Sequence, residues 1–273
     1  MFEEAGVEPP ETWEELLYVG EKIVEVHGEG KAISLAGTAA WDLIHNWAII
    51  LWSQGGEMLN EDNSKALFNS DAGYRAMEYY VELFKRDLAA KANAEYNQPQ
   101  ADAAFTNGDV AMYFMGPWNI AGIENDNPDL PYGVVQPPTG PAGKASFSGG
   151  SNLVIRNNAS KEEIKAAKAW IKFLLREENL IDYTKNLSHM LPTKVEAFND
   201  FYYNSGVWKT FKTTLDYATA YPPIVPWGQI EGAIVSNYKN VLSDYVNGLY
   251  DENTVKHYLG EAAAEVDYIL ESH

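Results

Sequence analysis

Residues Phe105 to Ile120 read FTNGDVAMYFMGPWNI, and this stretch decides the fold. Its middle, Val110 to Met115, is an apolar run with β-branched and aromatic members, which predicts a buried strand. The run ends at Gly116-Pro117, and proline suits the first position of a helix because its missing N–H would have no partner there. The pattern therefore places Trp118 after the carboxyl end of a strand and at the start of a helix, the edge where open α/β sheets bind ligands.

Trp118 has two interpretations at this position. A flat indole ring can cover the apolar face of a sugar while polar neighbours bind the sugar hydroxyls. The same ring can also be part of an ordinary core. The stretch alone leaves both interpretations open.

The composition excludes several classes of function. The chain has 273 residues, enough for two lobes or one large domain, and its net charge of −19 argues against nucleic acid and anionic membranes as partners. It has no cysteine, which excludes disulfides, thiolate metal sites and a cysteine nucleophile. Its five histidines show no metal spacing, so no metal and no cofactor are predicted. No signal peptide follows Met1, and no apolar run approaches the ~20 residues of a membrane span.

The remaining chain alternates helices with short strands, which predicts an α/β fold. Capping boxes at Thr12/Glu15 and Ser160/Glu163 predict two helix starts. Strands are expected at 31–35, 110–115, 132–136 and 152–155, a hairpin at 57–68, and helices at 12–27, 41–54, 69–87, 160–176, 227–245 and 253–270. The second half has too few strands for a lobe of its own, and it looks like part of a lobe whose other strands are absent.

Five short motifs occur in order along nearly the whole chain. They are FEEAGVEPPETWEEL (2–16), WAIILWSQGG (47–56), FTNGDVAM with GPW (105–112 and 116–118), SGGSNL (148–153) and LPT (191–193). In this order they resemble the motifs of the extracellular solute-binding proteins of sugar ABC importers, the maltose-binding-protein-like family.

The resemblance implies a type II periplasmic-binding-protein fold, with two lobes joined by hinge crossovers. Residues 1–147 would form the main part of the C-terminal lobe, 148–200 would return to the N-terminal lobe, and 201–273 would complete the C-terminal lobe. In this family a half-lobe precedes the Pro-Pro-Thr-Trp stretch, so the resemblance implies a fragment with an incomplete N-terminal lobe. A chain without that segment would expose sheet edges, which favours a dimer or a domain swap.

The resemblance also implies the function. Such proteins trap a monosaccharide or oligosaccharide in the cleft between their lobes, deliver it to an ABC permease, and do no chemistry. They lie in the periplasm or outside the cell.

Trp118 and Trp227 match the stacking platforms of the family and are the leading ligand contacts. Trp41 and Trp47 lie near a loop-to-helix entry that lines the cleft, although Trp47 also falls on the apolar face of its helix, where it could be core. Trp13 and Trp170 are assigned to packing.

Polar and small residues are further candidates for ligand contacts. His45 and Asn46 could bind sugar hydroxyls or have a structural role. Glu231, one turn beyond Trp227, could accept hydrogen bonds from hydroxyls or belong to a solvated helix face. Gly150 and Ser151 are candidates for a hinge with backbone contacts, because adjacent glycines rotate easily.

Two other classes stay open on sequence grounds. A glycoside hydrolase would also have an aromatic cleft, but it needs two carboxylates held across the glycosidic bond, and 39 acidic residues always supply candidate pairs. No catalytic residue is therefore assigned. A structural or docking module would be favoured if Trp118 and Trp227 were fully buried.

Overall fold

The structure is a computed structural model that describes residues 1–273 apart from the side chain of Ala40. The chain forms two compact units, each made from separate stretches of sequence. Unit 1 comprises Met1–Met115, Pro137–Phe147 and Tyr217–His273, and unit 2 comprises Gly116–Gln136 and Ser148–Asp216. The division of the sequence into three lobe segments stays a prediction.

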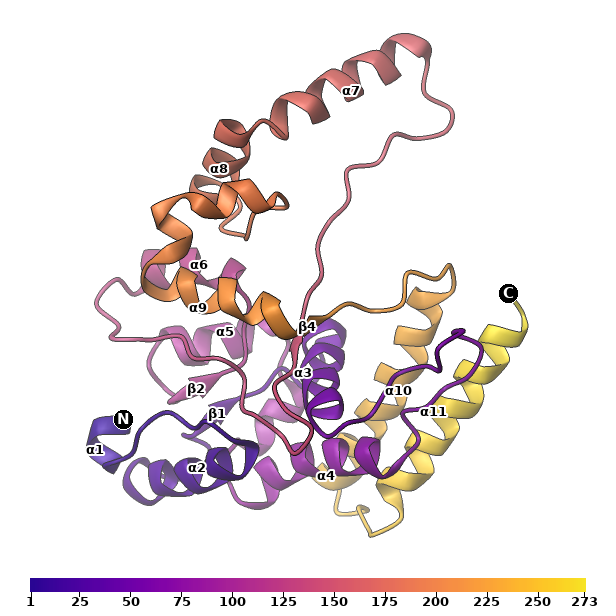
Figure 1. Cartoon of the computed structure of the whole chain (residues 1–273). Coiled ribbons are helices and arrows are strands. Elements are labelled where there is room, and N and C mark those ends of the chain that lie inside the picture. Colours follow the sequence, from indigo (N-terminus) through magenta and orange to yellow (C-terminus); the bar gives the residue numbers. More distant parts are fainter. The chain divides into compact units, whose positions relative to one another are not determined.

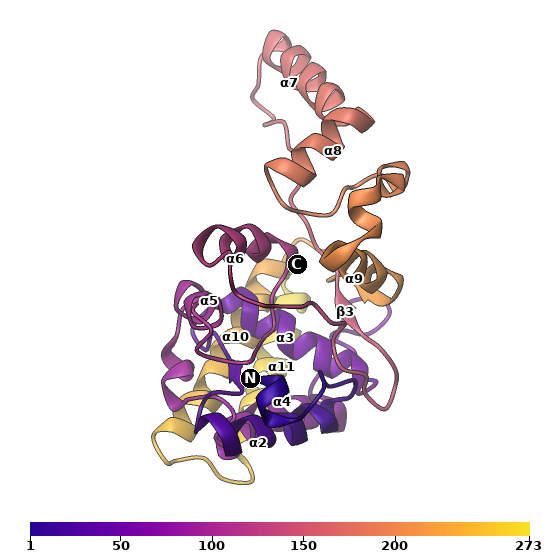
Figure 2. The same cartoon turned by 90° about the vertical axis from the view of Figure 1, so that its left-hand side faces the viewer.

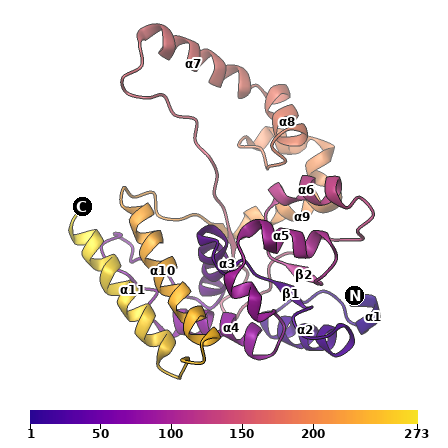
Figure 3. The same cartoon turned by 180° about the vertical axis from the view of Figure 1, so that it is seen from behind.

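Unit 1 is mainly helical, and α10 and α11 lie side by side in it (Figures 1 and 3). The predicted cap of α2 is confirmed, because Thr12 Oγ1 accepts a hydrogen bond from the Glu15 amide at 3.1 Å. The helices are α1 (Phe2–Ala5), α2 (Trp13–His27), α3 (Ala40–Ser53), α4 (Asp71–Lys85), α5 (Gln98–Thr106), α10 (Trp227–Val246) and α11 (Thr254–Glu271), with a 3-10 turn η1 (Lys91–Glu95).

The core of unit 1 is formed where α3, α4, α10 and α11 pack together. Its largest fully buried side chains include Trp47, Phe68, Tyr80 and Tyr238. Trp13 also packs here, as predicted, and its Nε1 donates a hydrogen bond to Ser53 Oγ at 2.8 Å. This core holds α3 and α10, the two helices that carry most of the candidate site residues.

The strands are shorter than the sequence predicts. The strand β1 (Ile33–Ser34) pairs in parallel with β2 (Met112–Tyr113), and β3 (Ser146–Phe147) pairs in parallel with β4 (Ala218–Thr219). The expected strands at 132–136 and 152–155 are wrong, because neither segment has a strand partner in the described chain. An extended segment becomes a strand only when a neighbour satisfies its backbone groups.

Unit 2 has a small core built around Ile120, Trp208 and Phe211. The hydroxyl groups of Thr184 and Tyr203 lie 2.6 Å apart and form a buried hydrogen bond. Its elements are η2 (Pro117–Asn119), α6 (Ile120–Asp126), α7 (Lys161–Leu174), α8 (Glu177–Asn186), η3 (Val195–Asn199), η4 (Phe201–Asn204) and α9 (Gly206–Thr214). The short turn η5 (Leu215–Tyr217) follows α9, and its last residue, Tyr217, is the first residue of the final segment of unit 1.

The helix α7 lies apart from the core of unit 2. Its predicted capping box is confirmed, but none of its described residues is buried. In three views no other helix of unit 2 lies along its length (Figures 1, 2 and 3). The packing role predicted for Trp170 is therefore wrong in this structure, where 57% of the side chain is exposed.

Among the described residues, no helix is both long enough and apolar enough to span a bilayer.

Candidate functional site

Unit 1 carries a row of rings that we call the aromatic strip: Trp41, His45, Phe147, Tyr221 and Trp227. Successive ring centroids lie 5.4 Å apart for Trp41–His45, 3.8 Å for His45–Phe147, 4.7 Å for Phe147–Tyr221 and 4.5 Å for Tyr221–Trp227. Trp41 leaves 66% of its side chain exposed, and Trp227 is half-buried. The strip therefore offers aromatic surface to a ligand at its Trp41 end.

Three segments distant in sequence build the strip. Trp41 and His45 lie one turn apart on α3, and Phe147 is the last residue of β3. Tyr221 follows β4 by two residues, so the parallel pairing of β3 with β4 brings Phe147 and Tyr221 to the same edge. Trp227 is the first residue of α10.

His45 is the polar centre of the strip. Its Nδ1 lies 2.9 Å from the Tyr221 hydroxyl, and burial lowers the His45 pKa to about 4. Burial also raises the pKa of Tyr221, so the phenol stays protonated at neutral pH and shares this hydrogen bond with a neutral imidazole. His45 therefore holds Tyr221 in place and carries no charge at neutral pH.

Two carboxyl groups on the helices that carry the strip, Glu231 on α10 and Asp42 on α3, have raised pKa values. Burial raises the pKa of Glu231, although a hydrogen bond from Trp227 acts in the opposite direction. On α3, burial and the charge of Asp102 raise the pKa of Asp42 to about 6. Asp42 Oδ2 is shielded from solvent and accepts no hydrogen bond from the described residues.

Sequence reasoning missed Asp42, Phe147 and Tyr221. Asp42 directly follows Trp41, but nothing in the local sequence distinguishes it from the other acidic residues of the chain. Asn46, one turn further along α3, is half-buried and lies near the buried Tyr80 side chain, and its ligand role stays a prediction.

Trp47 does not join the strip. Its side chain is 0% exposed and packs edge-on against Phe68 at 5.6 Å in the core of unit 1. The structure thus corrects its assignment as a ligand contact. Trp47 shares α3 with Trp41 but lies on the buried, apolar side of the helix.

Trp118 belongs to unit 2. Its side chain is 43% exposed and its ring covers Gly116, where an added Cβ would clash with the indole. Glycine at this position therefore makes room for the ring. Gly150 and Ser151 are both exposed, and a Cβ at Gly150 would meet nothing within 4 Å.

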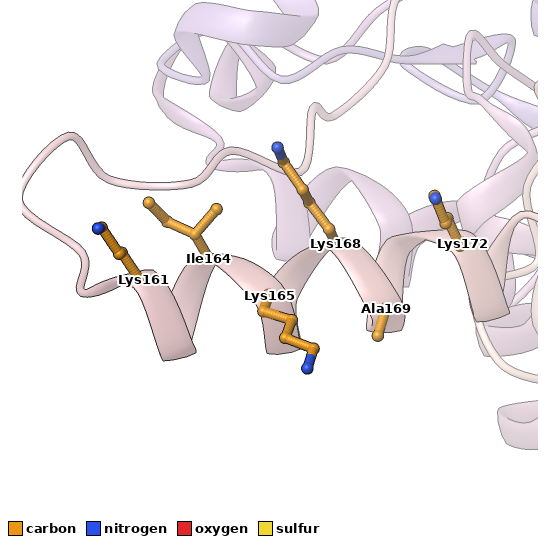
Figure 4. Close-up of a pocket in the computed structure, with 6 residues that line it drawn as sticks. All are labelled: Lys161, Ile164, Lys165, Lys168, Ala169 and Lys172. Atoms are coloured by element: carbon orange, nitrogen blue, oxygen red, sulfur yellow. The ribbon is translucent and has the colours of Figure 1, made fainter.

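A surface pocket along α7 is a different feature. It is lined by Lys161, Ile164, Lys165, Lys168, Ala169 and Lys172, with most of the lysines on one side of the helix (Figure 4). It lacks aromatic rings and so the stacking surface of a sugar site. In the described part of the chain, no group of three or more His, Asp or Glu side chains could hold a metal ion.

The amino-acid sequence matches a known protein family. A family model described as bacterial extracellular solute-binding protein matches residues 1–181. The chain belongs to this family.

Two relatives show the extent of the match. A putative binding protein of Brucella abortus (strain 2308) is 29% identical over 272 residues, which cover 99% of this chain and 64% of the relative. The multiple sugar-binding protein of Streptococcus mutans serotype c is 25% identical over 182 residues, 63% of this chain and 42% of the relative. This solute-binding protein therefore spans less than two thirds of the length of either relative.

Solved structures confirm the fold. An ABC transporter solute-binding protein from Thermotoga lettingae, bound with α-D-tagatose, has a TM-score of 0.81 at 27% identity, covering 98% of this chain and 68% of that chain. The maltose-bound MalE3 of T. maritima has a TM-score of 0.84 at 22% identity over the same fractions. The predicted helix-rich α/β fold of the type II periplasmic-binding-protein class is thus confirmed.

Proposed function

We propose that this solute-binding protein binds a sugar or oligosaccharide on the aromatic strip of unit 1. The observation that carries the proposal is the exposed ring of Trp41, which continues into a row of closely spaced rings, with the Glu231 carboxyl group one turn beyond Trp227. Rings of this kind stack on the apolar faces of sugars, and carboxylates accept hydrogen bonds from hydroxyls. Related proteins also bind sugars: one is a multiple sugar-binding protein and another is bound with α-D-tagatose.

Trp118 is a second proposed platform, carried by unit 2. Its half-exposed ring and its placement over Gly116 support this role. Gly150 and Ser151 stay proposed as hinge residues, which their exposure allows.

Delivery to a permease completes the proposal. The family is extracellular, and the relative from Thermotoga lettingae is an ABC transporter component. We therefore place the protein in the periplasm or outside the cell, where it hands its sugar to an ABC permease in the membrane.

A further polypeptide segment is also proposed. About a third of the Brucella relative lies outside its match to this chain, and α7 has no buried residue among those described. A segment that corresponds to this third would cover α7 and complete its lobe. Without it, the exposed face favours a dimer or a swap.

Calorimetric titration with maltotriose, cellotriose, xylotriose and raffinose tests sugar binding. We expect saturable binding of at least one sugar, weakened about tenfold or more in Trp41→Ala because a stacking ring is lost. Trp170→Ala on α7 is the matched control and should bind as the parent does. Absence of binding by all four sugars contradicts the function, and an unchanged affinity in Trp118→Ala contradicts that platform.

The same samples test the enzyme alternative. Chromatography of each trisaccharide after prolonged incubation should show no shorter product. Release of a mono- or disaccharide would instead favour a glycoside hydrolase.

A further inference from the structure

The aromatic strip contains residues from two stretches at which the chain leaves or enters unit 1. The chain leaves unit 1 after Phe147 and returns to it at Tyr217. The strands of these two stretches, β3 and β4, pair in parallel over only two residues each. A ladder of that length holds weakly by its backbone hydrogen bonds alone. Side chains of unit 1 must therefore help to keep both stretches in place.

His45 contacts both stretches from α3. Its ring centroid lies 3.8 Å from that of Phe147, the last residue of β3, and 5.5 Å from that of Tyr221, two residues after β4. The centroids of Phe147 and Tyr221 are 4.7 Å apart, so the three rings contact one another in a closed triangle. The hydrogen bond between His45 Nδ1 and the Tyr221 hydroxyl, at 2.9 Å, adds to these contacts. We call these three residues the His45 clamp.

The backbone is weakly held directly beyond the clamp. Residues 148–155 make no backbone–backbone hydrogen bond in the described structure, and Gly149 and Gly150 are exposed. Glycine rotates about φ and ψ at little steric cost. Phe147 thus marks the boundary between a stretch that tertiary contacts hold and a stretch that can rotate.

The clamp also acts on Trp227 through a stiff loop. Tyr221 precedes Pro222 and Pro223, and Pro226 precedes Trp227. Proline fixes its own φ and restricts the residue before it, so this loop has few conformations. The rings of Tyr221 and Trp227 stack at 4.5 Å between centroids with an interplanar angle of 24°. A shift of Tyr221 would therefore move Trp227 with it.

We propose that His45 is a positioning residue of the aromatic strip, which fastens both stretches to α3 and thereby sets where the rings beyond it meet a sugar. The inference rests on the proposed function, because it concerns the same site. It goes further in giving His45 a role that acts through Phe147 and Tyr221 and requires no contact of its own with the sugar.

Hydrogen–deuterium exchange of the full chain tests the clamp. In His45→Ala, which loses the ring contacts and the hydrogen bond, we expect the amides of 145–148 and 217–221 to exchange about fivefold or more faster than in the parent. Peptides from α4 and α11, in the same unit, should exchange at the rate of the parent. A general loss of stability would accelerate all peptides of unit 1, so the local pattern distinguishes positioning from destabilisation.

Two further variants separate the contacts of the clamp. His45→Phe keeps a ring against Phe147 and removes the hydrogen bond, whereas His45→Gln keeps a hydrogen-bonding group for Tyr221 and removes the ring. Each should accelerate the same amides by about twofold to threefold, less than His45→Ala does. Tyr258→Phe is the matched control, because it removes a hydroxyl that donates to Asp244 Oδ2 at 3.0 Å elsewhere in unit 1. It should leave both stretches unchanged, and circular dichroism should show that all variants are folded.

Sugar binding is measured on the same variants. The probes are maltotriose, cellotriose, xylotriose and raffinose, and calorimetric titration uses each sugar that binds the parent. We expect the affinity to be about fivefold or more weaker in His45→Ala and intermediate in His45→Phe and His45→Gln, because the rings of the strip are displaced. Tyr258→Phe should bind as the parent does.

The outcomes separate the inference from the proposed function. Unchanged exchange of 145–148 and 217–221 in His45→Ala, or an equal rise throughout unit 1, overturns the clamp. Local acceleration with an unchanged sugar affinity overturns the positioning role. Absence of binding by all four sugars overturns the proposed function and the positioning of a sugar with it, while the exchange pattern still decides whether the clamp exists.

Discussion

At the scale of single residues, Asp42 opposes folding at neutral pH. Its pKa rises from 3.8 to about 6 in the folded state, so the folded protein holds the proton more tightly than the unfolded chain does. Below about pH 4 the side chain is protonated in both states and does not reduce the free energy of unfolding. As the pH rises through about 6, the free energy of unfolding falls. Because the side chain is partly exposed, the loss amounts to about 1–2 kcal/mol rather than the full value of the shift.

Asp42→Asn should therefore stabilise the protein at neutral pH. We expect the free energy of unfolding to rise by about 1–2 kcal/mol at about pH 7.5 and to stay nearly unchanged at about pH 4. Urea denaturation of the variant and the parent at both pH values measures the difference. An equal gain at both would show that the carboxyl charge is not the cause.

The effect of His45 on folding stability has the opposite dependence on pH. Its pKa falls from 6.5 to about 4 on folding because burial disfavours the imidazolium. The stability that it contributes is present above about pH 6.5 and is lost as the pH falls through about 4. Protonation would also leave Nδ1 able only to donate to the Tyr221 hydroxyl.

His45→Gln should lessen the acid sensitivity of unit 1. An amide oxygen can still accept from Tyr221 but does not titrate in this range. We expect the parent to lose about 2 kcal/mol more than the variant between about pH 6.5 and about pH 4.5. Urea denaturation measures that difference, and identical losses would contradict the lowered pKa.

Single residues of the site could be predicted only where the local sequence indicates an exposed position, such as the start of a helix after a loop. Trp41, Trp118 and Trp227 follow loops or turn residues, and none is fully buried. Trp47 was uncertain because the same helical spacing suits a core residue and a cleft residue. Asp42 and Tyr221 could not be found, because their roles depend on neighbours that only the tertiary fold supplies.

At the scale of elements, α7 exposes apolar surface. Trp170 and Phe173 stack at 5.9 Å between ring centroids with an interplanar angle of 22°, and both are exposed. Exposed apolar patches bind hydrophobic dyes and promote association. Removing the two rings should cost the fold little, since surface changes away from special features stay within about 0.5 kcal/mol.

The double variant Trp170→Ser/Phe173→Ser should therefore bind less of the dye ANS and self-associate less, with an unchanged unfolding midpoint. Tyr268→Ser is the control, because Tyr268 is a similarly exposed ring on α11. Dye fluorescence and sedimentation velocity make the two measurements. Equal dye binding by parent and variant would show that α7 is not the apolar surface concerned.

Helices were more predictable than strands for a physical reason. The starts of α2 and α7 depend on caps within four residues, and the structure confirms both. Strands depend on partners elsewhere in the chain. Residues 152–155 have strand-like composition, but residues 148–155 make no backbone–backbone hydrogen bond in the described structure.

At the scale of the whole molecule, the core of unit 1 joins the two ends of the chain. The helices α3 and α4 come from the first third of the sequence, and α10 and α11 come from its last quarter, yet they share one core. Residues 148–158, between these parts, are mostly exposed, and Val154 leaves 84% of its side chain in solvent. Proteases cut such exposed, weakly bonded segments first.

Limited trypsin digestion should therefore cut first at Arg156 without separating the two fragments. The fragments 1–156 and 157–273 both contribute helices to the core of unit 1, so we expect the nicked protein to elute as one species under native conditions and as two in urea. Arg156→Gln should delay the first cut, because the other basic residues nearby lie on α7 or next to paired strands. Fragments that separate without denaturant would show that the two ends do not share a core.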